Sequence, residues 1–287
     1  MWFIFLLCVA ATSANFVNQL SFSGGGSFGA VEIGILEKIT EQWDITYDIY
    51  TGISAGALNA GFLSYFEDVK SGITYAEQIY GRIDNRAVYK LSPLTGVSVL
   101  NTDPLCKTLS VIVAEMDKQP VVHTLIGATN LNSGNLDVFS FEDNTDENKV
   151  RLLMSSSAIP GLFPPIEYGG YLYADGGVLS NELLNVEHTG DYVNITFITP
   201  YEGFVYQSEP IENLKDMLER TIRIVSANFN NPLSILDQNC EYPIGEINAY
   251  FVNSAYLEGY NMLNFNDGAE LIEIGYNHAE HRKYKLC

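Results

Sequence analysis

Apolar and polar positions along the chain follow two alternating periods. Short apolar runs typical of strands occur at residues 19–23, 45–50 and 121–129, and helical periods at residues 29–41 and 55–66 separate the first of them. Strands that alternate with helices in this way predict parallel strands joined by crossover helices. We therefore expect an α/β fold with a mostly parallel sheet covered by helices.

The same patterns continue through the second half of the chain. The predicted elements are a helix from Asp103 as N-cap to 115, a helix at 149–156, a hairpin at 166–174, a long amphipathic helix at 211–228 and a helix at 268–281. No repeat, low-complexity tract or linker interrupts them. We therefore expect a single domain over residues 15–287.

The first residues of the chain form an apolar run that ends in small residues. Residues 1–14 fit the h-region and cleavage site of a secretory signal peptide, although no Lys or Arg precedes the run, and an apolar N-terminal strand is the alternative. We expect a secreted or vacuolar-type luminal location. No later run is long enough to span a membrane, so no transmembrane segment is expected in the mature chain.

Cysteine and glycosylation signals add little. The mature chain would keep Cys106, Cys240 and Cys287, and either Cys240 pairs with Cys287 or the thiols stay unpaired. Asn194 begins the one glycosylation sequon, inside a strand-like run.

Composition and charge limit the partners. Hydrophobic residues make up 47% of the chain and charged residues 17%, which is typical of a packed globular protein. The net charge is −20, so the protein repels nucleic-acid phosphates and anionic bilayers. We expect no nucleic-acid binding, and any contact with lipid should use apolar or aromatic surface.

Two glycine-rich turns each follow a predicted strand and precede a predicted helix, where a parallel sheet places its site. In the first, residues 23–29 (SGGGSFG), the glycines let consecutive backbone N–H groups converge on one anionic oxygen. The same letters fit the dinucleotide fingerprint G-x-G-x-x-G, with Asp48 as the ribose ligand. A dinucleotide-binding oxidoreductase is therefore one alternative.

The second turn, residues 51–57 (TGISAGA), contains a G-x-S-x-G nucleophile elbow. Ser54 would sit at its tip, and glycines are needed at positions 52 and 56 because a serine in a strained turn presses its neighbours against the adjacent strand and helix. This context predicts a nucleophilic serine.

A nucleophilic serine needs a base. A Ser-His-Asp esterase would use His278 or His188, but neither lies in a supporting motif; His123 falls within a strand, and His278 and His281 fall near the end of the last predicted helix. Asp175 ends a strand and precedes two glycines, so its carboxylate can enter the site, although a turn capped by that aspartate has the same pattern.

In this order and spacing, the motifs resemble those of the patatin-like phospholipase family. Residues 24–29 match its oxyanion loop, residues 52–56 its elbow, residues 158–165 (AIPGLFPP) its A-x-P-x-x-F-P-P stretch and residues 175–177 its D-G-G. The likeness covers about residues 20–181.

The resemblance implies a three-layer α/β/α fold and a Ser–Asp dyad that hydrolyses acyl esters of phospholipids, lysolipids or galactolipids with no metal or cofactor. Ser54 would be the nucleophile and Asp175 the base. The loop would supply oxyanion donors and glycines would support the turns: Gly24, Gly25, Gly26 and Ser27 in the loop, and Gly52, Gly56, Gly176 and Gly177 in the turns.

Two positions depart from the family pattern. Phe28 stands where the family loop often carries Arg or Lys, and Leu183 replaces a proline common after the D-G-G. A free aspartate, with a pKa near ~3.9, is a poor base, so burial beside Tyr173 and Phe163 should raise the pKa of Asp175.

Other readings of the sequence stay open. The acidic surface favours zwitterionic or neutral lipids over anionic bilayers. Residues 71–100 form either a lid over the site or part of the core, and the acidic run at 142–147 lacks the spacing of a calcium loop. A non-catalytic storage or lipid-binding protein on the same scaffold is the remaining alternative.

Overall fold

The computed structural model describes residues 16–93, 96–116, 118–184, 192–203, 210–229 and 244–286. The predicted signal peptide at 1–14, His188, and both members of the predicted pair Cys240 and Cys287 lie outside the described residues. Cys106 is exposed and unpaired. None of the helices in the described ranges has the length and apolar character needed to cross a bilayer.

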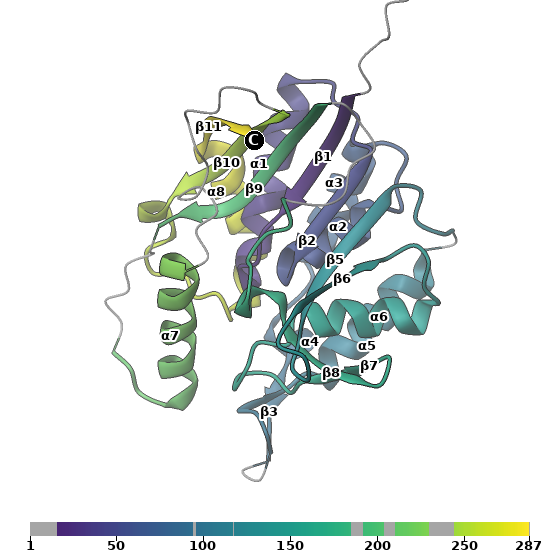
Figure 1. The fold of residues 1–287 in the computed structure, drawn as a ribbon. Coiled ribbons are helices and arrows are strands. Elements are labelled where there is room, and N and C mark those ends of the chain that lie inside the picture. Colours follow the sequence, from purple (N-terminus) through teal and green to yellow (C-terminus); the bar gives the residue numbers. More distant parts are fainter. Residues whose placement is uncertain are drawn as a thin grey trace, which may run out of the picture.

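A mixed sheet forms the centre of the molecule (Figure 1). Its five middle strands are parallel, in the order β10 (Gly245–Asn253), β9 (Tyr192–Glu202), β1 (Phe16–Phe22), β2 (Ile49–Ile53) and β5 (His123–Asn130). Antiparallel strands extend both sides: β11 (Ala279–Leu286) beside β10, and β6 (Leu136–Ser140), β8 (Tyr171–Asp175) and β7 (Ile166–Tyr168) beyond β5. The predicted α/β class with a mostly parallel central sheet is confirmed.

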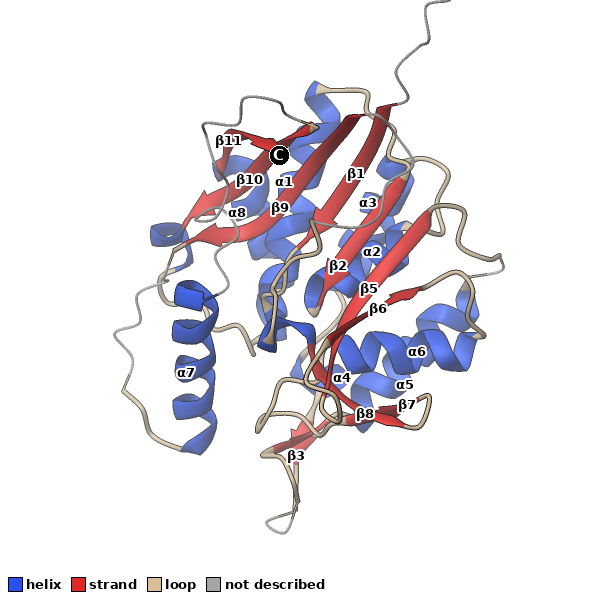
Figure 2. Ribbon diagram, viewed as in Figure 1, coloured by secondary structure: helices blue, strands red, loops and turns tan. Residues whose placement is uncertain are grey.

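The helices that alternate with the strands along the chain cover the sheet (Figure 2). Four lie behind it in this view: α1 (Gly29–Gln42), α2 (Ala55–Leu63), α3 (Val69–Tyr80) and α8 (Gly268–His278). The others are the short α4 (Asn85–Val88), then α5 (Asp103–Glu115), α6 (Asp146–Ser156) and α7 (Leu214–Phe229), with a small ribbon of β3 (Lys90–Leu91) and β4 (Leu100–Asn101) between α4 and α5. Two buried apolar clusters hold these layers together, one around β1 and α1 and one around α5 and α6.

The opposite face of β1 and β2 carries buried polar side chains. Gln19, Ser21 and Thr51 all donate hydrogen bonds to the backbone carbonyl of Leu183, at 2.6–3.4 Å. The segment after β8 therefore packs over the centre of the sheet by satisfying these side chains. This contact fixes the position of Leu183, where the family pattern commonly has a proline.

The structure corrects several predicted boundaries. The strand expected at 45–50 begins at Ile49, and Asp103 is the first residue of its helix, so that Thr102 is the N-cap. The last helix ends at His278, and His281 lies in β11, because residues 279–286 pair with β10. The hairpin at 166–174 and the long helix at 214–229 are where the sequence predicted them.

Candidate active site

Ser54 lies at the sharp turn between β2 and α2. Its φ of 55° makes it the one non-glycine residue with positive φ in the described part of the chain. A Cβ on Gly52 would lie 2.2 Å from the Gly56 carbonyl oxygen, and one on Gly56 would lie 2.4 Å from that of Ser23. Both flanking glycines are therefore required for the packing of the turn, and the strain places the Ser54 hydroxyl at the strand ends.

A second serine holds the strained turn. The Ser54 backbone N–H donates to Ser156 Oγ at 2.9 Å, and Ser156 Oγ donates to the Gly127 carbonyl at 2.7 Å. The last residue of α6 thus ties the turn to strand β5. No local sequence pattern indicates this role, because the bond joins residues about a hundred positions apart.

Ser54 and Asp175 meet directly. Ser54 Oγ donates to Asp175 Oδ2 at 2.7 Å, and the Gly177 N–H donates to Asp175 Oδ1 at 2.8 Å. The backbone of Asp175 is also fixed, because its N–H bonds to the Ala158 carbonyl and its own carbonyl accepts from Thr129. The two groups predicted to form the dyad are therefore within proton-transfer distance.

The surroundings of Asp175 change its acidity. The residue is only 5% exposed, and burial raises its pKa to about 6, although the bonds from Ser54 and Gly177 act in the opposite direction. Tyr173 and Phe163, the two residues expected beside it, are both buried. The direction agrees with the requirement that a carboxylate base have a pKa closer to neutrality.

The described histidines have other partners. His123 pairs with Glu142, His278 stacks on the ring of Tyr256, and His281 stacks on Tyr250. His278 therefore does not serve as the base of Ser54. The hydrogen bond from the Ser54 hydroxyl is accepted by Asp175 instead. The described residues thus give no support to the Ser-His-Asp alternative.

Two of the four candidate oxyanion donors are already engaged. The Gly24 N–H donates to the Asn181 carbonyl at 3.2 Å, and the Ser27 N–H donates to the Met262 carbonyl at 2.8 Å. Among the described residues, the N–H groups of Gly25 and Gly26 have no such backbone partner. This geometry narrows the predicted oxyanion donors to Gly25 and Gly26, and corrects the inclusion of Gly24 and Ser27.

Long-range contacts fix the shape of this loop. The side chain of Asn181 donates to the Gly24 carbonyl at 3.1 Å, and Ser27 Oγ donates to the Asn261 carbonyl at 3.1 Å. Gly26 has φ of +59°, and a Cβ there would lie 2.3 Å from the Met262 carbonyl oxygen, so only glycine fits. The sequence did not indicate these clamps.

A buried carboxyl anchors the start of the loop. Glu32 Oε1 accepts from the Ser23 N–H, and Glu32 Oε2 accepts from Asn59, each at 2.9 Å. Asn59 in turn accepts from the Tyr80 hydroxyl at 2.9 Å. Burial raises the pKa of Glu32 well above its ordinary value. The loop is thus connected to α2 and α3 through hydrogen-bonded side chains.

Asp48 is at the wrong end of the sheet for a ribose ligand. It precedes β2, and its carboxylate accepts from the backbone N–H of Asn18 at 2.9 Å, near the start of β1. The glycine loop follows the other end of β1. The dinucleotide-binding interpretation of residues 24–29 is therefore wrong.

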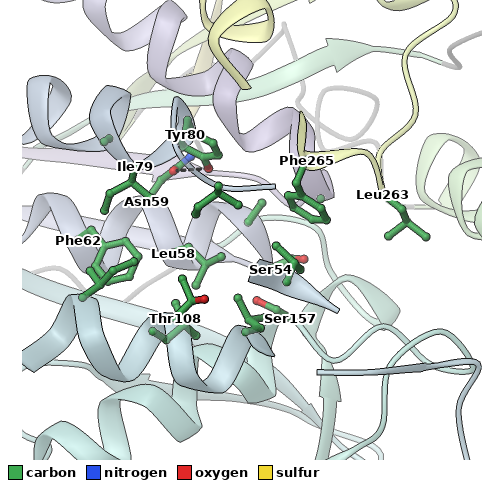
Figure 3. Close-up of a pocket in the computed structure, with 18 of the residues that line it drawn as sticks. Ser54, Leu58, Asn59, Phe62, Ile79, Tyr80, Thr108, Ser157, Leu263 and Phe265 are labelled. Carbon is green, nitrogen blue, oxygen red and sulfur yellow. Dashed lines mark hydrogen bonds between the residues drawn. The ribbon is translucent and has the colours of Figure 1, made fainter. Parts of the chain in front are cut away.

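An apolar pocket extends from Ser54 between the helices (Figure 3). In Figure 3, Phe62 lies at one end and Leu263 at the other, with Ser54 and Ser157 near the middle and Leu58 between Phe62 and Ser54. The walls come mostly from α2, α3 and α5. Residues of the predicted lid or core segment, among them Ala76, Ile79, Tyr80, Ile83 and Val88, form one wall, so this segment borders the site and also packs against the core.

A second pocket opens on the other side of Ser54, and we call it the Arg223 pocket. Its lining includes Ser54, Asp175, Gly25 and Arg223. Arg223 is 2% exposed, pairs with Glu219 at 3.1 Å, and places its guanidinium 5.0 Å from the centre of the Phe28 ring. A cation from α7 therefore lies beside the loop position where Phe28 replaces the basic residue common in the family.

A comparison with family models places these motifs in one family. The model described as patatin-like phospholipase matches residues 20–186, more than half of the chain. The chain belongs to the patatin-like phospholipase family. The match includes the glycine loop, Ser54, Asp175 and most of the apolar pocket, but not α7 or the residues around Met262.

Relatives in the family are distant. The chain is 26% identical to "Lysophospholipase NTE1" of Debaryomyces hansenii over 166 residues, covering 56% of this chain and 10% of that protein. It is 24% identical over 226 residues to an uncharacterised protein, R571, of Acanthamoeba polyphaga mimivirus, covering 72% of this chain and 75% of that one. The chain thus spans about a tenth of the length of the fungal relative.

Two solved structures also align with the chain. VipD from Legionella pneumophila has a TM-score of 0.45 and 14% identity, with 93% of this chain and 68% of that chain covered. The ExoU chain of the ExoU–SpcU complex from Pseudomonas aeruginosa has a TM-score of 0.37 and 15% identity, with 94% and 54% covered.

Proposed function

We propose that this chain is a lipid acyl hydrolase that cleaves carboxylic esters through an acyl-enzyme on Ser54, with Asp175 as the base. The observation that carries the proposal is the 2.7 Å hydrogen bond from Ser54 Oγ to a buried carboxylate at the tip of a strained elbow. Membership of the patatin-like phospholipase family supports it independently.

The reaction would use the chain's own groups in two steps. Asp175 accepts the Ser54 proton as Oγ attacks the ester carbonyl, and the Gly25 and Gly26 N–H groups donate to the oxyanion, each donor being worth ~3 kcal/mol. Collapse of the tetrahedral intermediate expels the alcohol, which takes the proton from Asp175. Asp175 then accepts a proton from water as the water attacks the acyl-enzyme. The second tetrahedral intermediate collapses by breaking the bond to Ser54 Oγ, which takes the proton back from Asp175, and the fatty acid leaves.

The two pockets suggest how the substrate lies. The apolar pocket suits one fatty acyl chain, because its walls are aliphatic and aromatic. The Arg223 pocket contains Asp175 and would take the alcohol, so a phosphate-bearing head group would lie near the guanidinium. A phospholipid or lysophospholipid is therefore the proposed substrate class.

A fluorophosphonate probe tests the nucleophile and excludes a non-catalytic lipid-binding protein. We expect covalent labelling of the full chain and release of fatty acid from lysophosphatidylcholine, both lost in Ser54→Ala because no other group can form the acyl-enzyme. The exposed Ser71→Ala variant, on α3, is the control and should label like the wild type. Labelling that persists in Ser54→Ala, or a wild type that neither labels nor hydrolyses lipid, would contradict the proposal.

A further inference from the structure

Three consecutive serines at the end of α6 differ in their hydrogen bonds. Ser155 Oγ donates to the Arg151 carbonyl at 2.8 Å, within its own helix, and Ser156 Oγ bonds both Gly127 and the Ser54 N–H. Ser157 Oγ has no hydrogen-bond partner within the described ranges, although the residue is only 8% exposed. Equivalent hydroxyl groups on neighbouring residues are therefore satisfied in two cases and unsatisfied in the third.

An unsatisfied buried hydroxyl needs an explanation. Leaving such a group unpaired destabilises the folded state, and one reason for retaining it is a role in function. Ser157 lines the apolar pocket together with Ser54 and Gly26. In the view of Figure 3, Ser157 lies below Ser54, near the middle of the residues that line the pocket.

The backbone on both sides of Ser157 is bonded to the reacting residues. Ser156 holds the Ser54 N–H, and the Ala158 carbonyl accepts from the Asp175 N–H at 2.9 Å. The Ser157 N–H itself bonds back to the last turn of α6, to the Leu153 carbonyl at 3.2 Å. The Ser157 hydroxyl is thus carried on a segment whose position relative to the nucleophile and the base is fixed.

The glycine loop has only some of its N–H groups available for an oxyanion. Gly24 and Ser27 have committed their N–H groups to Asn181 and Met262, which leaves Gly25 and Gly26 as loop donors. Serine side chains are among the groups that stabilise oxyanions in acyl transfer.

We propose that the Ser157 hydroxyl is a third oxyanion donor, which hydrogen-bonds the carbonyl oxygen of the ester as that oxygen becomes negative. Ser157 keeps its proton throughout and forms no covalent bond. The inference rests on the proposed function, since it needs an ester that Ser54 attacks. The interaction strengthens in the transition state, so it acts on kcat more than on KM.

Kinetics of the full chain with lysophosphatidylcholine test the inference. We expect Ser157→Ala to lower kcat about 100-fold, in line with the loss of one oxyanion donor, with KM changed less than about twofold. Ser155→Ala is the matched control and should keep the wild-type kcat, because that hydroxyl bonds within its helix and lines neither pocket.

A transition-state mimic provides a second readout. An alkyl trifluoromethyl ketone forms an oxyanion adduct with serine, so its inhibition constant should rise in Ser157→Ala by a factor similar to the fall in kcat. Binding of the ether analogue of the lysolipid, which lacks the ester carbonyl, should not change. The melting temperature should stay the same or rise, since the substitution removes an unsatisfied polar group; Ser157→Gly is the second variant if the alanine protein fails to fold.

The outcomes separate the two proposals. A Ser157→Ala enzyme with the kcat of Ser155→Ala, or with a raised KM and an unchanged kcat, overturns the inference and leaves the hydrolase standing. A wild type without Ser54-dependent hydrolysis contradicts the proposed function, and the inference falls with it.

Discussion

The two pockets that meet at Ser54 differ in which parts of the chain build them. The apolar pocket draws most of its wall from α2, α3 and α5, all inside the segment that matches the family model. The Arg223 pocket takes Tyr201, Arg223 and Met262 from beyond that segment. The pocket proposed for the acyl chain is therefore built mostly by the segment that carries the family motifs, whereas the pocket proposed for the alcohol also depends on residues beyond that segment.

This difference predicts that the chemical step and the selectivity for the alcohol depend on different parts of the chain. Ser54 and Asp175 both come from the family segment, so the reacting pair does not depend on α7. Arg223 comes from α7, contacts the ring of Phe28 in the glycine loop and shares a pocket with that loop. We expect changes in the two regions to affect different kinetic parameters.

The largest effect is expected at Asp175, where the chemistry occurs. Asp175→Asn should lower kcat by a factor on the order of 1,000 or more, because the amide can still accept the hydrogen bond but cannot take the proton of Ser54. Steady-state hydrolysis of lysophosphatidylcholine measures it, with circular dichroism as the check on folding. Undiminished activity in a folded Asp175→Asn protein would remove Asp175 from the mechanism.

The pH profile of the wild type provides a second measure of Asp175. Burial raises its pKa to about 6, so kcat/KM should fall tenfold for each pH unit below that value, as the base becomes protonated.

The stability of the folded state should change with pH in the opposite direction to the activity. The folded state binds this proton more tightly than the unfolded chain, so the contribution of Asp175 to the free energy of unfolding is greatest below pH ~4 and declines as the pH rises to about 6.

A smaller effect, confined to long acyl chains, is expected in the apolar pocket. Leu58→Trp should fill the space between Ser54 and Phe62 and lower kcat/KM for a sixteen-carbon ester about 100-fold while sparing a four-carbon ester. Val111→Trp, at a position 57% exposed on α5, adds the same side chain outside the pocket and should leave both rates unchanged. Equal losses for both esters in Leu58→Trp would contradict the assignment of this pocket to the acyl chain.

The smallest effect is expected on the alcohol side. Replacing the buried pair with Arg223→Met and Glu219→Gln together avoids leaving one charge buried alone. Hydrolysis of lysophosphatidylcholine should fall about tenfold, while monoacylglycerol with the same acyl chain should be unaffected.

The control for that comparison is an exposed pair with the same spacing. Arg151 and Glu147 on α6 are also four residues apart, at 3.2 Å, with side chains that face solvent. Arg151→Met with Glu147→Gln should leave both substrates unchanged. If the buried double variant loses both activities equally, Arg223 acts on the structure of the loop and not on the head group.

The parts of the site that the sequence predicted are those set by local backbone requirements. Gly52, Ser54 and Gly56 are close in the chain, and the turn tolerates no Cβ on either glycine, so the motif itself reports the geometry. Asp175 could be found for the same reason, from the glycines that follow it. The glycine loop was located correctly, but which of its N–H groups remain available depends on residues 181 and 262, which no local pattern specifies.

The fold shows the same division. Of the five parallel strands, β1, β2, β5 and β9 contain runs that the sequence marks as strand-like, whereas β10 was not predicted. Residues 279–281, the first of β11, were assigned to the end of a helix, because β11 is mostly exposed and polar and only pairing with β10 makes it a strand. Ser156 and Ser157 could not be singled out from the sequence, since the bond of Ser156 to Ser54 and the place of Ser157 in the pocket arise only in the folded chain.

The clamp on the glycine loop has a consequence for synthesis of the protein. Ser27 bonds the carbonyls of residues 261 and 262, more than 230 positions later in the chain. A nascent polypeptide that has already folded the elbow, and has even paired Ser54 with Asp175, still lacks the segment that locks the amide donors in place. The loop therefore reaches its final conformation only after residues 261 and 262 have joined the fold, so its formation depends on contacts between segments that leave the ribosome at very different times.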